Sequence, residues 1–272
     1  MNTPLNPDEA AALLKWYVEM GVDDAIGIEP QGLYNWKPPT PAALMPLGDA
    51  KAPSAKMASS NPTIAEIAPG ADEAIAWATE IAAGCNDFEA LKLAVEGFDG
   101  CPLKTGARNT VFADGVPGAE LLVIGEAPGA EEDRTGKPFV GRAGQLLDRM
   151  LAAIGRSRKE NVLISNVIYW RPPGNRTPTN TETAICRPFV ERLIELTNPK
   201  AIMLAGGAPM QALMGITGIM RARGVWRDLT IENGAHFPAL PVFHPAFLLR
   251  QPKNKRLAWA DLQSLEARLN KD

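Results

Sequence analysis

The hydrophobic positions from residue 101 onward alternate between short continuous runs and stretches with helical spacing. The runs predict buried strands at 121–124, 162–167, 201–204 and 240–243, and the spaced stretches predict helices at 143–154, 182–196, 209–214 and 256–269. Thr179 and Glu182 have the spacing of a capping box at the start of the second of these helices. Strands that alternate with helices indicate an α/β fold, here a three-layer α/β/α sandwich around a central, mostly parallel four-stranded sheet.

The first hundred residues have a different pattern. Residues 1–28 include an amphipathic stretch that predicts one helix, residues 29–62 are rich in Pro and Ala without a sustained period, and residues 63–99 predict a further helical segment. We therefore expect a helical N-terminal extension joined by a linker to a larger domain at 100–272.

A long charged loop follows the first predicted strand. Residues 125–144 contain five glycines, two prolines and three adjacent carboxylates, whereas most connections are about 4–6 residues long. Pro138 stands where a phosphate-binding P-loop needs Ser or Thr, and Gly125 and Gly129 are too far apart for a dinucleotide fingerprint. We therefore expect a different kind of binding site at the carboxyl end of this strand, and the alternative is an elaborate but inert loop.

The other three predicted strands also end in polar loops, which should meet at the same edge of the sheet. This edge would combine carboxylates, carboxamides, an imidazole and a phenyl ring, from Glu126, Glu132, Asn166, Asn175, His244 and Phe139. Such groups suit the stacking and hydrogen bonding of a flat heterocycle, with acid–base or electrostatic catalysis. The chain has two histidines and no set of residues with zinc-ligand spacing, which disfavours metal-dependent hydrolysis.

The charge is distributed unevenly along the chain. Residues 1–100 hold 15 Asp or Glu and 5 Lys or Arg, a net charge of −10, whereas residues 101–272 hold 16 and 23, a net charge of +7. A basic domain favours a polyanionic partner. No apolar run reaches about 18 residues, so we expect no membrane span. The three widely spaced cysteines do not form a disulfide framework, and a reducing, cytoplasmic location is expected.

Four motifs resemble those of the uracil-DNA glycosylase superfamily and are most similar to its family 4. They are Gly125-Glu-Ala-Pro-Gly, Gly136-Lys-Pro-Phe-Val-Gly, Asn166 to Pro178 with its Arg-Pro-Pro-Gly-Asn core, and His244-Pro-Ala-Phe-Leu-Leu-Arg. The resemblance covers about residues 100–269. It implies a monomeric enzyme that flips uracil out of DNA and hydrolyses its N-glycosidic bond, leaving an abasic site for base excision repair.

The resemblance also implies residue roles. Phe139 would stack on uracil, Asn166 would form hydrogen bonds with its O4 and N3–H, and His244 would donate a hydrogen bond to its O2. Glu126 and Asn175 would position or polarise water, and Glu132 would exclude the methyl group of thymine. Ala127 and Gly129 would line the base site, although the best-known members carry Asp where this chain has Ala127. Leu248 would wedge into the duplex, and nearby phosphates would meet the basic cluster Arg250, Lys253, Lys255 and Arg256, with the segment 156–159 as the alternative.

The cysteines depart from the family pattern. The resemblance implies four cysteine ligands for a four-iron, four-sulfur cluster, and Cys101 and Cys186 occupy two of those places. Phe98 and Trp170 occupy the other two. Because such clusters are held by four thiolates, we expect no intact cluster and no other cofactor, with the two rings filling the space as apolar packing.

Two other functions remain open from the sequence. Ala127 in place of Asp is compatible with a binding module that recognises uracil or abasic sites but cleaves poorly. A nucleotide-processing hydrolase on a similar sheet is the other alternative, since a fold does not fix a function.

Overall fold

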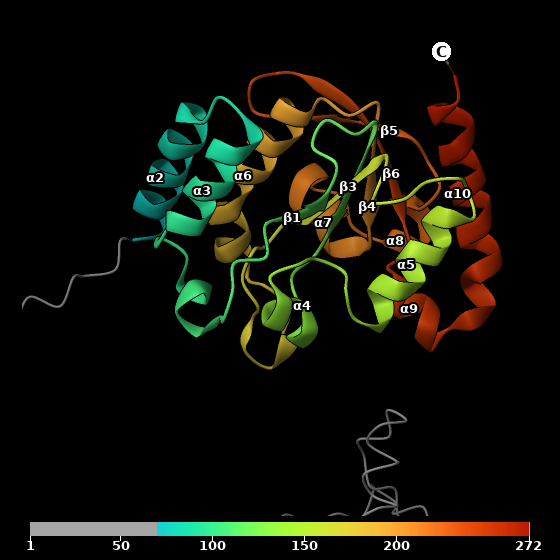
Figure 1. Ribbon diagram of the computed structural model, residues 1–272, viewed down its shortest axis with the longest axis horizontal. Helices are drawn as coiled ribbons and strands as arrows, with labels where there is room; N and C mark the ends of the chain where they lie inside the picture. The colour runs from blue at the N-terminus through green and yellow to red at the C-terminus, as the bar shows by residue number, and fades with distance from the viewer. Residues whose placement is uncertain (1–69, 272) are drawn as a thin grey trace, which may run out of the picture. The chain divides into compact units, whose positions relative to one another are not determined.

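The computed structural model describes residues 70–271, and these form one compact unit (Figure 1). The helix predicted within residues 1–28 and the linker predicted at 29–62 lie outside the described residues. No helix in the described part of the chain is long and apolar enough to cross a membrane.

The centre of the unit is a six-stranded sheet with the order β1-β3-β2-β4-β6-β5. The four inner strands are parallel and correspond to the four predicted ones, namely β2 (Leu121–Gly125), β3 (Val162–Asn166), β4 (Ala201–Ala205) and β6 (His236–Val242). Short antiparallel strands, β1 (Ala113–Gly115) and β5 (Arg227–Thr230), form the two edges. The sheet therefore has two more strands than predicted, because these edges are too short and too polar to give a hydrophobic run.

Helices cover both faces of the sheet, as the strand–helix alternation predicts. One face carries α6 (Asn180–Thr197) and α7 (Gly207–Met214), and the other carries α5 (Arg142–Ala152), α9 (Pro245–Arg250) and α10 (Lys255–Leu269). Two separate hydrophobic clusters fill the space between the sheet and these layers. The resulting α/β/α sandwich is visible in Figure 1.

The helices predicted within residues 63–99 are part of this unit. They are α2 (Ala71–Gly84) and α3 (Phe88–Gly97), and both pack against α6. Ala74, Ala78 and Ala82 of α2 are buried in the same cluster as the face of the sheet. Arg192 of α6 donates two hydrogen bonds, of 2.9 and 2.6 Å, to the carbonyl of Cys85. The structure therefore gives no boundary between packed units at residue 100.

The loops at the carboxyl ends of the parallel strands contain short helices that the hydrophobic pattern did not predict. The long loop holds α4 (Ala130–Thr135), the segment after β3 holds the 3-10 turn η3 (Pro173–Asn175), and β6 leads directly into α9. Helix α8 (Ile219–Ala222) lies between α7 and β5, and two further 3-10 turns are η2 (Pro102–Gly106) and η4 (Pro252–Asn254). In Figure 1, α4 and α9 lie along the same lower edge of the unit.

Candidate active site

Three of the four polar loops, those after β2, β3 and β6, meet around one pocket of about 550 Å³ at the carboxyl edge of the sheet, whereas Ala208 of the loop after β4 lines a neighbouring pocket. We call it the reactive pocket. Its lining includes every residue for which a catalytic or base-binding role is predicted, which are Glu126, Ala127, Gly129, Glu132, Phe139, Asn166, Asn175 and His244. Arg250 of the basic cluster also lines it. The structure thus brings together groups that are up to about 120 residues apart in the sequence.

The floor of the pocket depends on a glycine at the end of β2. Gly125 pairs with Asn166 across the parallel strands β2 and β3. A Cβ atom at residue 125 would overlap both the Oδ1 atom of Asn166 and the ring of Phe139. The absence of a side chain therefore lets a carboxamide and an aromatic ring share one small site. Both of these side chains are buried in the walls of the pocket.

The backbone of Phe139 is held in an unusual conformation. Its φ angle is +54°, in the left-handed region that non-glycine residues rarely occupy. The guanidinium of Arg158 donates to the carbonyls of Pro138 at 2.9 Å and Phe139 at 2.8 Å. Arg158 is itself fixed by ion pairs with Asp114 and Asp148, at 3.1 and 2.8 Å. One partly buried cation therefore anchors the segment that carries the ring of Phe139.

The carboxylate of Glu132 is fully occupied by the loop. It accepts backbone N–H bonds from Gly129 at 3.1 Å and from Val140 and Gly141, each at 2.9 Å. The first of these bonds also caps the start of α4. These contacts show a clamp that joins the two ends of the loop. Glu132 also lines the pocket, and its role in excluding a methyl group stays a prediction.

His244 stands directly before α9 and acts as its N-cap. Its Nδ1 atom accepts the backbone N–H of Ala246 at 3.1 Å. Burial, together with the positive charge of Arg250, lowers the pKa of His244 from 6.5 to about 4, while Glu132 opposes the shift. The imidazole is therefore neutral at physiological pH, and because Nδ1 is an acceptor, its proton resides on Nε2. Its ring centre lies 5.7 Å from that of Phe139.

Two further polar groups complete the pocket. Burial raises the pKa of Glu126, which follows Gly125 at the end of β2. Asn175 also has a left-handed backbone, with a φ of +54°, and its Oδ1 accepts a 2.8 Å hydrogen bond from Nε of Arg171. The amide nitrogen of Asn175 is thus the end of the side chain that remains to act as a donor. Ala127 packs its methyl group against the hydrophobic core.

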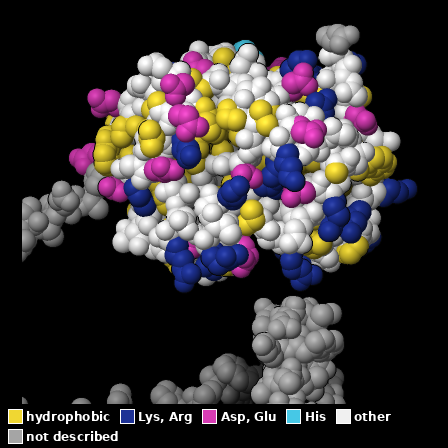
Figure 2. Space-filling view, in the orientation of Figure 1, with side chains coloured by type: hydrophobic (Ala, Val, Ile, Leu, Met, Phe, Trp, Pro, Cys, Tyr) yellow, Lys and Arg dark blue, Asp and Glu magenta, His cyan; other side chains and the backbone are white. Residues whose placement is uncertain are grey.

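The basic cluster is exposed beside the reactive pocket. Arg250 ends α9, Lys253 lies in η4, and Lys255 and Arg256 begin α10, and all four side chains are exposed. Lys and Arg side chains recur along the lower edge of the view in Figure 2, which is the edge of α4 and α9. By contrast, Arg156 and Arg158 of the alternative segment are mostly buried and ion-paired.

Leu248 does not lie where a wedge would lie. Only 1% of this residue is exposed, because α9 turns it into the hydrophobic cluster beneath α5 and α10. Its neighbours Phe247 and Leu249 are half-buried. The structure therefore contradicts an exposed Leu248, and Leu249 is the leucine of this segment that reaches the surface.

The space where the family places a metal cluster is filled with aromatic rings. Phe98 and Trp170 are buried with their ring centres 6.4 Å apart, and Phe189 meets Phe98 at 5.0 Å. The thiols of Cys101 and Cys186 are buried, and the interaction between them lowers the pKa of Cys101 and, together with burial, raises that of Cys186. Within residues 70–271, no group of three or more His, Cys, Asp or Glu side chains is placed to hold a metal ion. The donors in this region do not fit a four-thiolate cluster.

Comparisons with known proteins agree with the geometry of the site. The family described as the uracil DNA glycosylase superfamily matches residues 112–263. A Type-4 uracil-DNA glycosylase of Thermotoga maritima is 37% identical over 176 residues, which cover 63% of this chain and 89% of that protein. Proteins of the same name are 36% identical over 170 residues in Pyrobaculum aerophilum (61% and 86% of the two chains) and 33% over 188 residues in Sulfurisphaera tokodaii (66% and 84%). This chain therefore belongs to the uracil-DNA glycosylase superfamily, in its family 4.

Proposed function

We propose that this protein is a uracil-DNA glycosylase, a hydrolase that removes uracil from DNA in base excision repair. The observation that carries the proposal is the convergence of Phe139, Asn166 and a neutral His244 on one pocket. The family relationship supports the same activity. The substrate is uracil-containing DNA, and the product is DNA with an abasic site.

Base recognition rests on Phe139 and Asn166. The phenyl ring offers a flat apolar surface for an extruded base, and stacking of this kind is worth about 1–3 kcal/mol per base. The carboxamide of Asn166 can donate to O4 and accept from N3–H of uracil. Cytosine presents the opposite pattern at these two positions, with an amino donor and a ring acceptor. The fixed position of Asn166 beside Gly125 thus supports discrimination between the two pyrimidines.

Bond cleavage rests on His244. Breaking the N-glycosidic bond leaves negative charge on the departing uracil, and an Nε2–H donor held at the pocket stabilises that charge at O2. The bond from Ala246 to Nδ1 fixes this tautomer before the substrate binds. One preoriented donor of this kind contributes about 2.7–4 kcal/mol to the lowering of a barrier.

We assign the positioning and polarisation of the attacking water to Glu126 and Asn175, and their presence in the lining of the reactive pocket supports this assignment. Burial raises the pKa of Glu126, which makes its carboxylate a stronger base than an exposed one. This compensates in part for Ala127, which supplies no carboxylate. A weak base is sufficient when water attacks a sugar that is already cationic.

Arg250, Lys253, Lys255 and Arg256 give the protein an exposed basic surface beside the pocket. We propose that this surface binds DNA phosphates. Neutralising Lys253 and Lys255 together should reduce the slope of log affinity against log salt by about one unit for each phosphate that these side chains pair with. An unchanged slope would place the DNA path elsewhere.

We further propose that the enzyme works without an iron–sulfur cluster. The packing of Phe98 and Trp170 in place of two ligands supports this proposal. The purified protein should show no absorption near 400 nm and no bound iron. A brown protein with about four irons per chain would contradict it.

The activity is tested on a single-stranded oligonucleotide with one uracil, by alkaline cleavage at the abasic product in the presence of a chelator. The wild-type protein should cleave, His244→Ala should lose most of the rate, and His236→Ala should retain it. His236 is a matched control because its side chain is exposed and bonds Thr230 at 2.9 Å, outside the reactive pocket. Activity that requires an added divalent ion, or no activity on any uracil-containing strand, would refute the proposal.

A further inference from the structure

A second pocket lies directly beside the reactive pocket. It has a volume of about 510 Å³, compared with about 550 Å³, and the two pockets share Glu126 and Thr177 as lining residues. The second pocket lies between α6 and α7, which are neighbours on the same face of the sheet. A group bound there would therefore be in contact with the wall that holds the reacting nucleotide.

The lining of this second pocket combines hydrogen-bonding groups with an apolar base. Val167 and Ile168 are buried apolar residues at its wall, while Asn180 and Gln211 bring exposed carboxamides from α6 and α7. Thr183 adds a hydroxyl group. Carboxamides can pair with donors and acceptors on the edge of any nucleobase. The composition resembles that of a base site and contains no acidic group other than Glu126.

A proline within α6 removes the usual helical donor of one backbone carbonyl near the second pocket. Pro188 has no N–H, so the carbonyl of Ala184 lacks the donor that it would normally have four residues later. Ala184 lines the second pocket.

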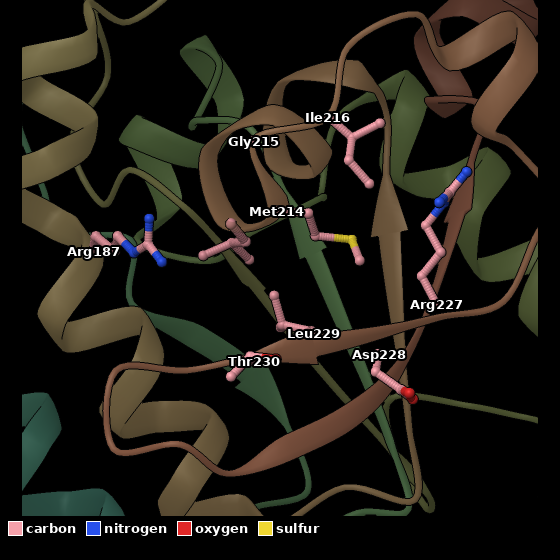
Figure 3. A pocket seen from close by; sticks show the side chains of 9 residues that line it. Arg187, Met214, Gly215, Ile216, Arg227, Asp228, Leu229 and Thr230 are labelled. Atoms are coloured by element: carbon pink, nitrogen blue, oxygen red, sulfur yellow. The ribbon is translucent and has the colours of Figure 1, made fainter.

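The hollow continues away from the reactive pocket. A third pocket, of about 680 Å³, shares Arg187 and Gly215 with the second. Figure 3 shows Arg187 extending from α6 toward Met214, with Arg227 on β5 across the hollow. The side chain of Arg187 is paired with Glu191 at 2.6 Å but remains 44% exposed. A cation therefore stands at the far end of the second pocket, where the backbone of a bound nucleotide would continue.

We propose that the second pocket is a nucleotide subsite that takes the base adjacent to the uridine in an unpaired DNA strand. The inference rests on the proposed function, since the uridine must occupy the reactive pocket. Two features indicate that this neighbouring base occupies the second pocket. The second pocket shares a wall with the reactive pocket, and its hydrogen-bonding side chains match the donors and acceptors on the edge of a base. An unpaired strand is the substrate that suits it, because a paired neighbour would have to leave the duplex at a cost of a few kcal/mol.

The experiment compares short single-stranded oligonucleotides in which the base next to the uridine, on one side or the other, is present or is replaced by an abasic spacer. For the wild-type protein, KM should rise about fivefold or more when the neighbouring base is absent on one side, which corresponds to about 1 kcal/mol. Ala184→Leu, which places a larger side chain in the wall of the second pocket, should make KM less sensitive to that base. Gln211→Ala should reduce the same ratio without adding volume.

The control is Ala83→Leu, the same substitution at an exposed residue of α2 that lines a different hollow beside α6. It should keep the wild-type ratio of KM values. A wild-type KM that is indifferent to both neighbouring bases would overturn the proposal. An Ala184→Leu protein that keeps the wild-type ratio of KM values would also overturn the proposal. An Ala184→Leu protein in which only the inhibition by free uracil changes would overturn it as well, because that result would assign the pocket to the departing uracil. Failure of the wild-type protein to release uracil from any strand would instead refute the proposed function.

Discussion

Replacing Arg158 with alanine should weaken uracil binding, although Arg158 does not line the reactive pocket. Its guanidinium bonds the carbonyls of Pro138 and Phe139 and is itself held by Asp114 and Asp148. Only 13% of the side chain is exposed, so water does not replace these contacts in the folded protein. The substitution therefore removes the anchor of the stacking ring and leaves the ring itself intact.

The expected magnitude follows from two opposing free energies. A hydrogen bond from a charged donor contributes about 1.5–3 kcal/mol, so two such bonds hold the segment with about 3 kcal/mol or more. A non-glycine residue in the left-handed region costs about 1–3 kcal/mol. These values are of the same size, so Phe139 would relax toward an ordinary conformation once Arg158 is removed. Without its stacking interaction, worth about 1–3 kcal/mol, uracil should bind about 5- to 150-fold more weakly.

The assay measures inhibition by free uracil, affinity for abasic DNA and thermal unfolding for Arg158→Ala and for a matched variant, Arg156→Ala. Arg156 is equally buried, with 11% exposed, but it bonds Glu120 and Asn270, each at 3.1 Å, and not the loop of Phe139. Both variants should unfold at a lower temperature, and only Arg158→Ala should lose uracil affinity. Arg158→Lys should restore it in part, because one ammonium can replace one of the carbonyl bonds. Equal loss of uracil affinity in the two alanine variants would refute the reasoning.

Three other predictions follow from the reactive pocket and α9. Because the folded protein holds His244 at a pKa of about 4 and an ordinary His titrates near 6.5, the unfolded chain alone gains a proton between these values. Stability should therefore be full above pH 6.5 and fall by about 3 kcal/mol as the pH drops toward 4; denaturant titrations should show this fall and its loss in His244→Gln. Asn166→Asp should lower uracil excision by orders of magnitude, measured as single-turnover rates, and a wild-type rate would remove Asn166 from the base site. Leu248→Ala should destabilise the fold by about 2–5 kcal/mol through a cavity, whereas Leu249→Ala should reduce excision from duplex more than from single strands; the reverse pattern would restore the wedge role to Leu248.

The central fold could be predicted because its sequence signals are strong. Strands β2, β3 and β4 and the second half of β6 are buried, and each contains a short apolar run. Helix α6 begins with the capping box of Thr179 and Glu182. The edge strands β1 and β5 gave no such signal, since β1 is Ala-Asp-Gly and β5 buries only Leu229. Helices α4 and α9 are six residues long, which is too short for a helical period to be recognised.

The sequence predicted which residues line the reactive pocket better than it predicted the hydrogen bonds and packing of these residues. Motif order indicated which residues meet, because strand ends converge on one edge of a parallel sheet. It did not show that three backbone N–H groups occupy Glu132, or that α9 turns Leu248 inward. The anchoring role of Arg158 was missed, because the sequence suggested only phosphate binding for the segment 156–159. Its only sequence signal is a position within a basic segment, which is equally typical of a surface that binds phosphate.

The left-handed residues Phe139 and Asn175 also bear on how far this protein can be stabilised. Both line the reactive pocket, and glycine would adopt their backbone angles without steric cost. Asn175→Gly should therefore release strain in the folded state while it removes a donor to water, although the added freedom of the unfolded chain offsets part of the gain. With the roles proposed for Phe139 and Asn175, we expect that the residue that suits the backbone and the residue that suits the reaction differ at these two positions. A thermostable form of the enzyme should therefore be sought in the helices, and these two residues kept, because their strain accompanies the activity.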